Sequence, residues 1–101
     1  MHLSLASCVV ASDDQVHTRV GEEAVILGLN TGIYYGLAEV GLRVWSLIAT
    51  PQRVSVLVST IVDEFDVTRE RCEADVLTLL ESLLERELIR DVTSAGDETP
   101  S

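Results

Sequence analysis

The chain has 101 residues, enough for one small domain with a modest hydrophobic core, and its formal net charge is −10. A strongly anionic protein repels phosphate backbones and anionic lipid headgroups, so nucleic acid and membrane surfaces are poor candidate partners. No apolar run approaches the ~20 residues of a membrane-spanning helix, and the N-terminus lacks the basic segment of a secretory signal. We therefore expect a cytoplasmic protein.

The first strands are expected within residues 8–20. Residues 8–11 form an apolar run that polar turn residues follow, which indicates a short strand. Residues 15–20 alternate, with Val16, Thr18 and Val20 on one face, and indicate a second strand or a continuation of the first across a bulge. With the hairpin that follows, the first forty residues are predicted to hold an antiparallel meander of three or four strands.

The strongest local signal lies at residues 25–37. Two runs rich in β-branched and aromatic residues flank Asn30, Thr31 and Gly32, which is typical of a β-hairpin with a three-residue turn and a positive φ at Gly32. Alternate residues of a strand share a face, so one apolar face of the hairpin is predicted. Its members are Val25, Leu27, Leu29, Ile33, Tyr35 and Leu37. We expect the helices that follow to cover this face.

After the hairpin the hydrophobic period changes to that of helices. Residues 39–49 are predicted to form a first helix with Trp45 in the core, and residues 54–65 a second helix. Thr68 is suited to cap a third helix that reaches about residue 87, because its hydroxyl can accept a hydrogen bond from a first-turn amide.

The end of the chain divides into two parts. Residues 88–92 are expected to be briefly extended, whereas residues 93–101 are small and polar and are predicted to be a disordered acidic tail. We therefore predict one domain over residues 1–92.

The third predicted helix carries two apolar rows about 100° apart, although a helix that rests on a core needs only one stripe of about that width. One row contains Leu77, Leu80 and Leu84, and the other contains Cys72, Val76, Leu79 and Leu83. Two rows fit deep burial between other helices. They also fit a helix of which one row packs inward while the other lines a groove.

Residues with catalytic or metal-binding chemistry are sparse. His2 and His17 have no cysteine or carboxylate at ligand spacing, and Cys8 and Cys72 lie too far apart to indicate a zinc site or a redox pair. No nucleophile elbow, phosphate-binding loop or zinc-protease motif occurs. We therefore predict no enzymatic activity, no catalytic residue, no metal and no cofactor.

Two segments together resemble the PqqD-like family. Residues 21–45, which contain the hairpin and then Glu39-Val40-Gly41 and Val44-Trp45, are similar to that family, and so is the closing Cys72-Glu73-Ala74-Asp75-Val76-Leu77 with the leucines after it. The resemblance spans roughly residues 15–92. Ala38 departs from the Asn or Asp that is common before the first helix, which puts the N-cap of that helix in doubt.

The resemblance implies an α+β, winged helix-turn-helix-like fold with a three-stranded antiparallel sheet followed by three helices. It also implies a peptide-recognition role, as in the recognition elements of pathways that modify ribosomally made peptides. The implied partner is the leader region of a precursor peptide. A short, free-standing member resembles the leader-binding proteins of lasso-peptide systems, which act with a separate leader peptidase and a cyclase.

The implied site lies along the second strand of the hairpin and the third helix. A leader peptide would add antiparallel to residues 33–37, whose unpaired edge can accept another strand, and the second row of the helix would wall a groove beside it. The predicted peptide-binding residues are Ile33, Tyr34, Tyr35, Gly36, Leu37, Cys72, Asp75, Val76 and Leu79.

Two alternatives remain at this point. The first is a PqqD-type peptide chaperone for pyrroloquinoline-quinone or for another peptide that a radical enzyme modifies. The second is a winged-helix DNA-binding protein whose third helix would enter the major groove. Between residues 69 and 86 that helix carries three arginines against five acidic residues, which argues against DNA binding.

Overall fold

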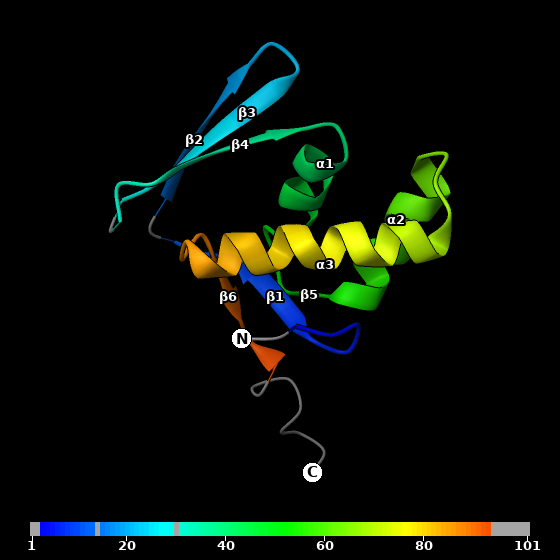
Figure 1. The fold of residues 1–101 in the computed structure, drawn as a ribbon. Coiled ribbons are helices and arrows are strands. Elements are labelled where there is room, and N and C mark those ends of the chain that lie inside the picture. The colour runs from blue at the N-terminus through cyan, green and yellow to red at the C-terminus, as the bar shows by residue number, and fades with distance from the viewer. Residues whose placement is uncertain (1–2, 14, 30, 94–101) are drawn as a thin grey trace.

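The computed structural model describes residues 3–13, 15–29 and 31–93. In that part of the chain, two three-stranded antiparallel sheets accompany three α-helices (Figure 1). The predicted α+β fold, a small antiparallel sheet followed by three helices, is confirmed. The second sheet was not predicted.

The first sheet is the predicted meander. It consists of β2 (Gln15–Val20), β3 (Glu23–Gly28) and β4 (Tyr34–Ala38), in the order β2-β3-β4. Gly32 has a φ of +70°, the positive value that the turn sequence predicts. Because β3 lies in the middle, β2 and β4 both present an edge of the sheet.

The second sheet joins segments that are far apart in the sequence. β1 (Cys8–Ala11) lies between β5 (Gln52–Arg53) and β6 (Ile89–Asp91), so β1 does not extend the meander. β6 falls in the segment that was expected to be extended. Thr93, the first residue of the predicted tail, accepts a hydrogen bond through its hydroxyl from the backbone N–H of Cys8 at 2.9 Å. Residues 94–101 of that tail lie outside the described residues.

The three helices agree with the predicted segments. They are α1 (Val40–Leu47), α2 (Val54–Glu64) and α3 (Arg69–Glu85). The Thr68 hydroxyl accepts a hydrogen bond from the backbone N–H of Arg71 at 3.3 Å, so the predicted cap of α3 is present.

The start of α1 has no such cap. Its N-cap residue is Glu39, which makes no capping hydrogen bond through its side chain and has a φ of +51°. A positive φ is unfavourable for a residue with a side chain, so the turn from β4 into α1 is a strained position. The absence of an Asn or Asp at position 38 thus goes with a helix start that lacks a side-chain cap.

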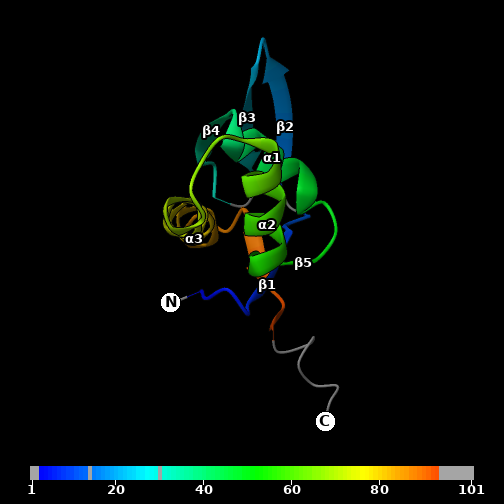
Figure 2. The same cartoon turned by 90° about the vertical axis from the view of Figure 1, so that its right-hand side faces the viewer.

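The core lies where the helices meet the two sheets (Figure 2). Trp45 is 6% exposed, as its place on the apolar side of α1 predicts. Four apolar residues of α2 (Val54, Leu57, Val58 and Ile61) and several from both rows of α3 are also buried, whereas Val56 of α2 is 49% exposed. Among the largest fully buried side chains are Ile26, Ile48, Leu57, Ile61, Leu80 and Leu88.

The predicted apolar face of the hairpin is wrong for the residues of the first strand. Leu37 pairs with Ala24 and Tyr35 pairs with Ile26, so the loop between paired positions has four residues, 29–32, and not three. Successive side chains of a strand point to opposite faces, so a loop that is one residue longer reverses which side chains of β3 face the core. Ala24 and Ile26 are fully buried, whereas Val25, Leu27 and Leu29 lie on the outward side, with Leu29 59% exposed.

Candidate functional site

A cavity of about 300 Å³ lies between β4 and α3, with α1 and the α2–α3 turn at its base. In both views of the ribbon β4 lies above α3 (Figures 1 and 2). Seven of the nine predicted site residues line it, namely Tyr35, Gly36, Leu37, Cys72, Asp75, Val76 and Leu79. The structure therefore brings the strand and helix parts of the predicted site together around one groove.

The α3 wall of the groove changes from polar at the rim to apolar at the floor. Cys72 and Val76 are 3% and 1% exposed, so they form part of the core as well as the floor of the groove. Leu79 is only partly buried and lies higher on the wall. Asp75 is exposed at the rim, where its carboxylate lies 3.5 Å from the Arg71 guanidinium. The second apolar row of α3 thus packs inward and lines the groove at the same time.

The β4 wall has an open edge. Leu37 is buried against the core, Tyr35 is partly buried, and Gly36 is exposed. β4 is the last strand in the order β2-β3-β4, so no strand among the described residues pairs with its other edge. An exposed edge strand carries unpaired backbone N–H and C=O groups that another strand can use. The groove is therefore able to accept an extended peptide.

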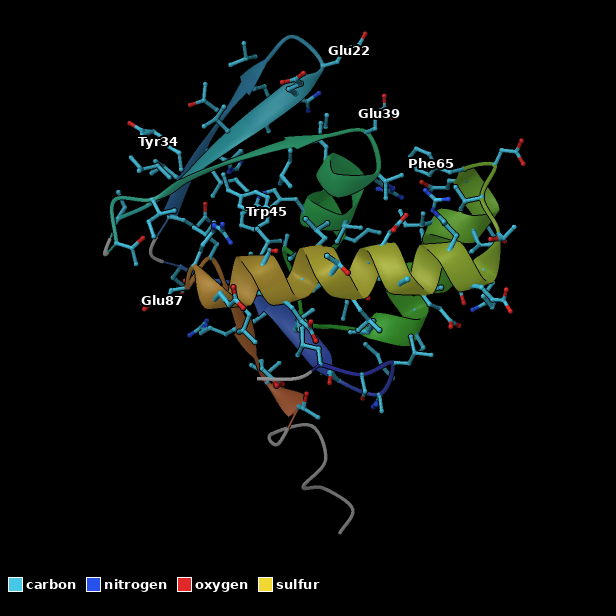
Figure 3. All side chains as sticks on the ribbon, in the orientation of Figure 1. Glu22, Tyr34, Glu39, Trp45, Phe65 and Glu87 are labelled. Atoms are coloured by element: carbon cyan, nitrogen blue, oxygen red, sulfur yellow. The ribbon has the colours of Figure 1, made fainter. Side chains whose placement is uncertain are left out.

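Two predicted residues do not line the cavity. Ile33 is 40% exposed and precedes β4, and Tyr34 is 66% exposed on the side of the strand that faces away from α3 (Figure 3). This placement follows from the strand period, because Tyr34 and Tyr35 must point to opposite faces. The side chain of Tyr34 therefore does not enter the groove.

Sequence reasoning missed five residues that line the cavity, namely Ala38, Val40, Gly41, Ile61 and Val67. They come from the end of β4, from α1 and α2 and from the α2–α3 turn, and their spacing along the chain carried no signal for a shared site. Gly41 has a direct role in the shape of the groove. A Cβ atom built there would lie 3.2 Å from Leu37 Cδ2 and 3.8 Å from Leu79 Cδ2, so the missing side chain leaves space between the two walls.

The chemistry of the groove is that of a binding site with an apolar interior. Burial raises the pKa of the Cys72 thiol, and the nearby Asp75 carboxylate raises it further, so Cys72 stays protonated at neutral pH. Its Sγ lies 3.8 Å from the Val58 carbonyl oxygen. In the part of the chain that the structure describes, no group of histidine, cysteine and acidic side chains could hold a metal ion. No helix there is long and apolar enough to cross a membrane.

Comparisons with solved structures found two close matches of fold. TbiB1 in complex with the TbiA(beta) leader peptide is 37% identical, with a TM-score of 0.73, and the match covers 80% of this chain and 94% of TbiB1. Lasso peptide synthetase B1 complexed with the leader peptide is 17% identical, with a TM-score of 0.71 and coverage of 81% and 96%, and supports the fold alone. A search of curated proteins found no significant match.

The family comparison agrees with the structural one. The model of coenzyme PQQ synthesis protein D (PqqD) matches residues 23–89, which include β3, β4 and all three helices. The matched range therefore contains both walls of the groove. Together with the similarity to TbiB1 over most of both chains, this match shows that the chain belongs to the PqqD family.

Proposed function

We propose that this protein binds the leader segment of a ribosomally made precursor peptide, which adds as an antiparallel strand to β4. The observation that carries the proposal is the apolar groove beside β4, which is an edge strand of its sheet. The similarity to TbiB1, which was solved with a leader peptide bound, supports it. Strand addition supplies affinity through the backbone, and the groove supplies selectivity through side-chain pockets.

The energetics of the groove fit this role. A leader aromatic side chain that buries ~150–250 Å² gains roughly 4–6 kcal/mol at ~25 cal/mol/Å², before ordering costs are subtracted. A few backbone hydrogen bonds add about 1 kcal/mol each. We therefore expect a dissociation constant in the range from about nanomolar to low micromolar.

The proposed residues have different roles in binding. Cys72 and Val76 form the floor against which an apolar leader side chain packs, and Leu79 forms the wall. Asp75 at the rim is placed to accept a hydrogen bond from the leader or to pair with a basic leader residue. The β4 residues act mainly through backbone groups.

The partner enzyme in this proposal is a leader peptidase, to which the protein presents the bound peptide. The β2-β3-β4 sheet has an outer apolar face on the side away from α3, made by Val16, Val20, Val25, Leu27 and Tyr34. A leader strand on β4 would extend this sheet, so its outward side chains would continue the same face. We infer that the peptidase contacts this outer face, because large exposed apolar patches mark interaction sites.

The protein itself is proposed to be non-catalytic, without a cofactor, and cytoplasmic. Its cyclase or other modifying enzymes would act on the peptide that it holds. The pathway proposed is lasso-peptide biosynthesis. The alternative is a PqqD-type role in pyrroloquinoline-quinone synthesis, and the description of the matching family favours this alternative. A precursor gene beside the gene of this protein would distinguish the two pathways by the peptide that it encodes.

The test is calorimetric titration of the protein with the leader of that neighbouring precursor and, for comparison, with the TbiA(beta) leader. We expect saturable 1:1 binding that Leu79→Glu weakens and Asp75→Ala weakens less, while a circular-dichroism melt shows that both variants fold. Random duplex DNA in a gel-shift assay at low salt is expected not to bind. Tight DNA binding without leader binding would refute the proposal in favour of a winged-helix DNA-binding protein.

A further inference from the structure

Arg86 lies next to Tyr35, one of the residues that line the groove. It is the C-cap residue directly after α3, and its guanidinium carbon lies 5.2 Å from the centroid of the Tyr35 ring. Its Nη1 donates a hydrogen bond to the carbonyl oxygen of Ser82 at 3.1 Å. These two contacts hold the cation beside the end of the groove where β4 begins. Arginine held against an aromatic ring in this way loses little further freedom when it binds an anion.

This guanidinium has no acidic partner among the residues that the structure describes. Of the other six arginines, Arg43, Arg71 and Arg90 each pair there with a carboxylate. Arg19, Arg53 and Arg69 do not, but none of these three is among the residues that line the groove or contact Tyr35. Arginine carries five N–H donors, and the contact with Ser82 uses one of them. Arg86 is therefore a positioned cation beside the groove, with N–H donors that are available to a bound peptide.

The period of the strand relates Arg86 to the rest of the groove. Leu37 and Tyr35 share the face of β4 that lines the cavity. In a peptide that runs antiparallel to β4, the residue opposite Leu37 directs its side chain into the apolar cavity. The residue two positions further toward the peptide's C-terminus then lies opposite Tyr35, on the same face and next to Arg86.

We propose that Arg86 binds an Asp or Glu side chain of the leader, two residues C-terminal to the apolar residue that fills the cavity. This inference rests on the proposed leader-binding function and narrows its substrate to peptides with an apolar residue and a carboxylate at this spacing. A guanidinium can donate two parallel N–H bonds to a carboxylate, which fixes geometry as well as affinity. Since the protein carries a net charge of −10, a leader carboxylate is unfavourable elsewhere on its surface, so Arg86 also fixes the register.

The test is a charge-swap cycle with the leader that binds in the calorimetric titration. Glu, Gln and Lys are placed singly at each position of its binding segment, and affinities are measured for the unmutated protein, Arg86→Gln and Arg86→Glu. At one position we expect Glu to bind the unmutated protein about 10-fold more tightly than Gln, a difference of about 1.4 kcal/mol. Arg86→Gln should abolish this preference, and Arg86→Glu should make Lys the preferred residue there.

Arg90→Gln is the matched control, because it removes the same charge from β6, where Arg90 pairs with Asp13 at 3.6 Å. We expect this control to keep the preference for Glu. If Arg86→Gln retains the preference, or weakens the Glu and Gln peptides equally, the inference is refuted while leader binding stands. If no leader binds the unmutated protein, the proposed function fails and this inference fails with it.

Discussion

Filling the groove from its base should separate binding from folding. Gly41 is the second residue of α1, and the side chain that it lacks would project between Leu37 and Leu79. We predict that Gly41→Ala weakens leader binding and that Gly41→Leu weakens it much more, while both variants remain folded. A substitution that lowers affinity without unfolding the protein identifies the groove as the binding site. A charge placed in the core is a weaker test, because unfolding alone would also abolish binding.

The magnitudes follow from the local contacts. Gly→Ala at a position with ordinary helical backbone stabilises a protein by about 0.4–1 kcal/mol, because it restricts the unfolded chain. The nearest atom to the new methyl group is the terminal Cδ2 of Leu37 at 3.2 Å, so the end of this side chain must shift by a few tenths of an ångström. Overpacking a filled site costs roughly 1–3 kcal/mol, so we expect about a 5-fold loss of affinity for Ala and at least ~30-fold for Leu.

The measurement is calorimetric titration with the leader peptide, together with a thermal melt of each variant. Ser46→Leu is the matched control, because it adds the same side chain to the exposed side of α1. It should leave affinity unchanged. If Gly41→Leu melts like the unmutated protein and binds the leader equally well, the peptide does not occupy this cavity and the assignment of the site is wrong.

Three further predictions concern the turn, the wall and the floor of the groove. Gly32→Val should destabilise the protein by more than ~1 kcal/mol in a melt, because a β-branched residue is strained at a φ of +70°; an unchanged melt would count against this. Leu79→Glu should fold and lose at least ~2 kcal/mol of binding, whereas Val76→Glu should unfold because Val76 is 1% exposed; equal behaviour would contradict the division into wall and floor. The raised pKa and burial of Cys72 should make it react with iodoacetamide more slowly than the partly buried Cys8, and bound leader should slow only Cys72; equal protection of both thiols would indicate a global effect.

Local signals were sufficient to predict most elements of the fold. The turn at Gly32, the cap at Thr68 and the change from a period of two to one near 3.6 each depend on neighbouring residues, so the sequence carries them directly. The second sheet depends on pairs such as Val9 with Gln52 and Val10 with Arg90, which are far apart in the chain. Two of its strands have two and three residues, too short for a periodic signal.

The candidate site was only partly predictable for a related reason. Strand and helix residues could be named because each set shares a periodic face, and the family resemblance related the two sets. Gly41 and Val67 carry no such pattern, because they enter the groove only through the packing of α1 and of the α2–α3 turn. The face of β3 was misassigned because the loop length fixes the register, and the sequence of residues 29–32 is compatible with either length.

The sheet has two edges, and backbone pairing alone cannot choose between them. β2 and β4 both end the sheet, yet the groove lies beside β4, where α3 and α1 supply its walls and floor. In the proposed function, selection of the leader therefore comes from these helices rather than from the strand. The two faces of β4 then have separate tasks, since Tyr35 and Leu37 line the groove while Tyr34 belongs to the outer apolar face. In the proposed function, β4 holds the peptide beside its groove face and leaves its outer face free for the leader peptidase.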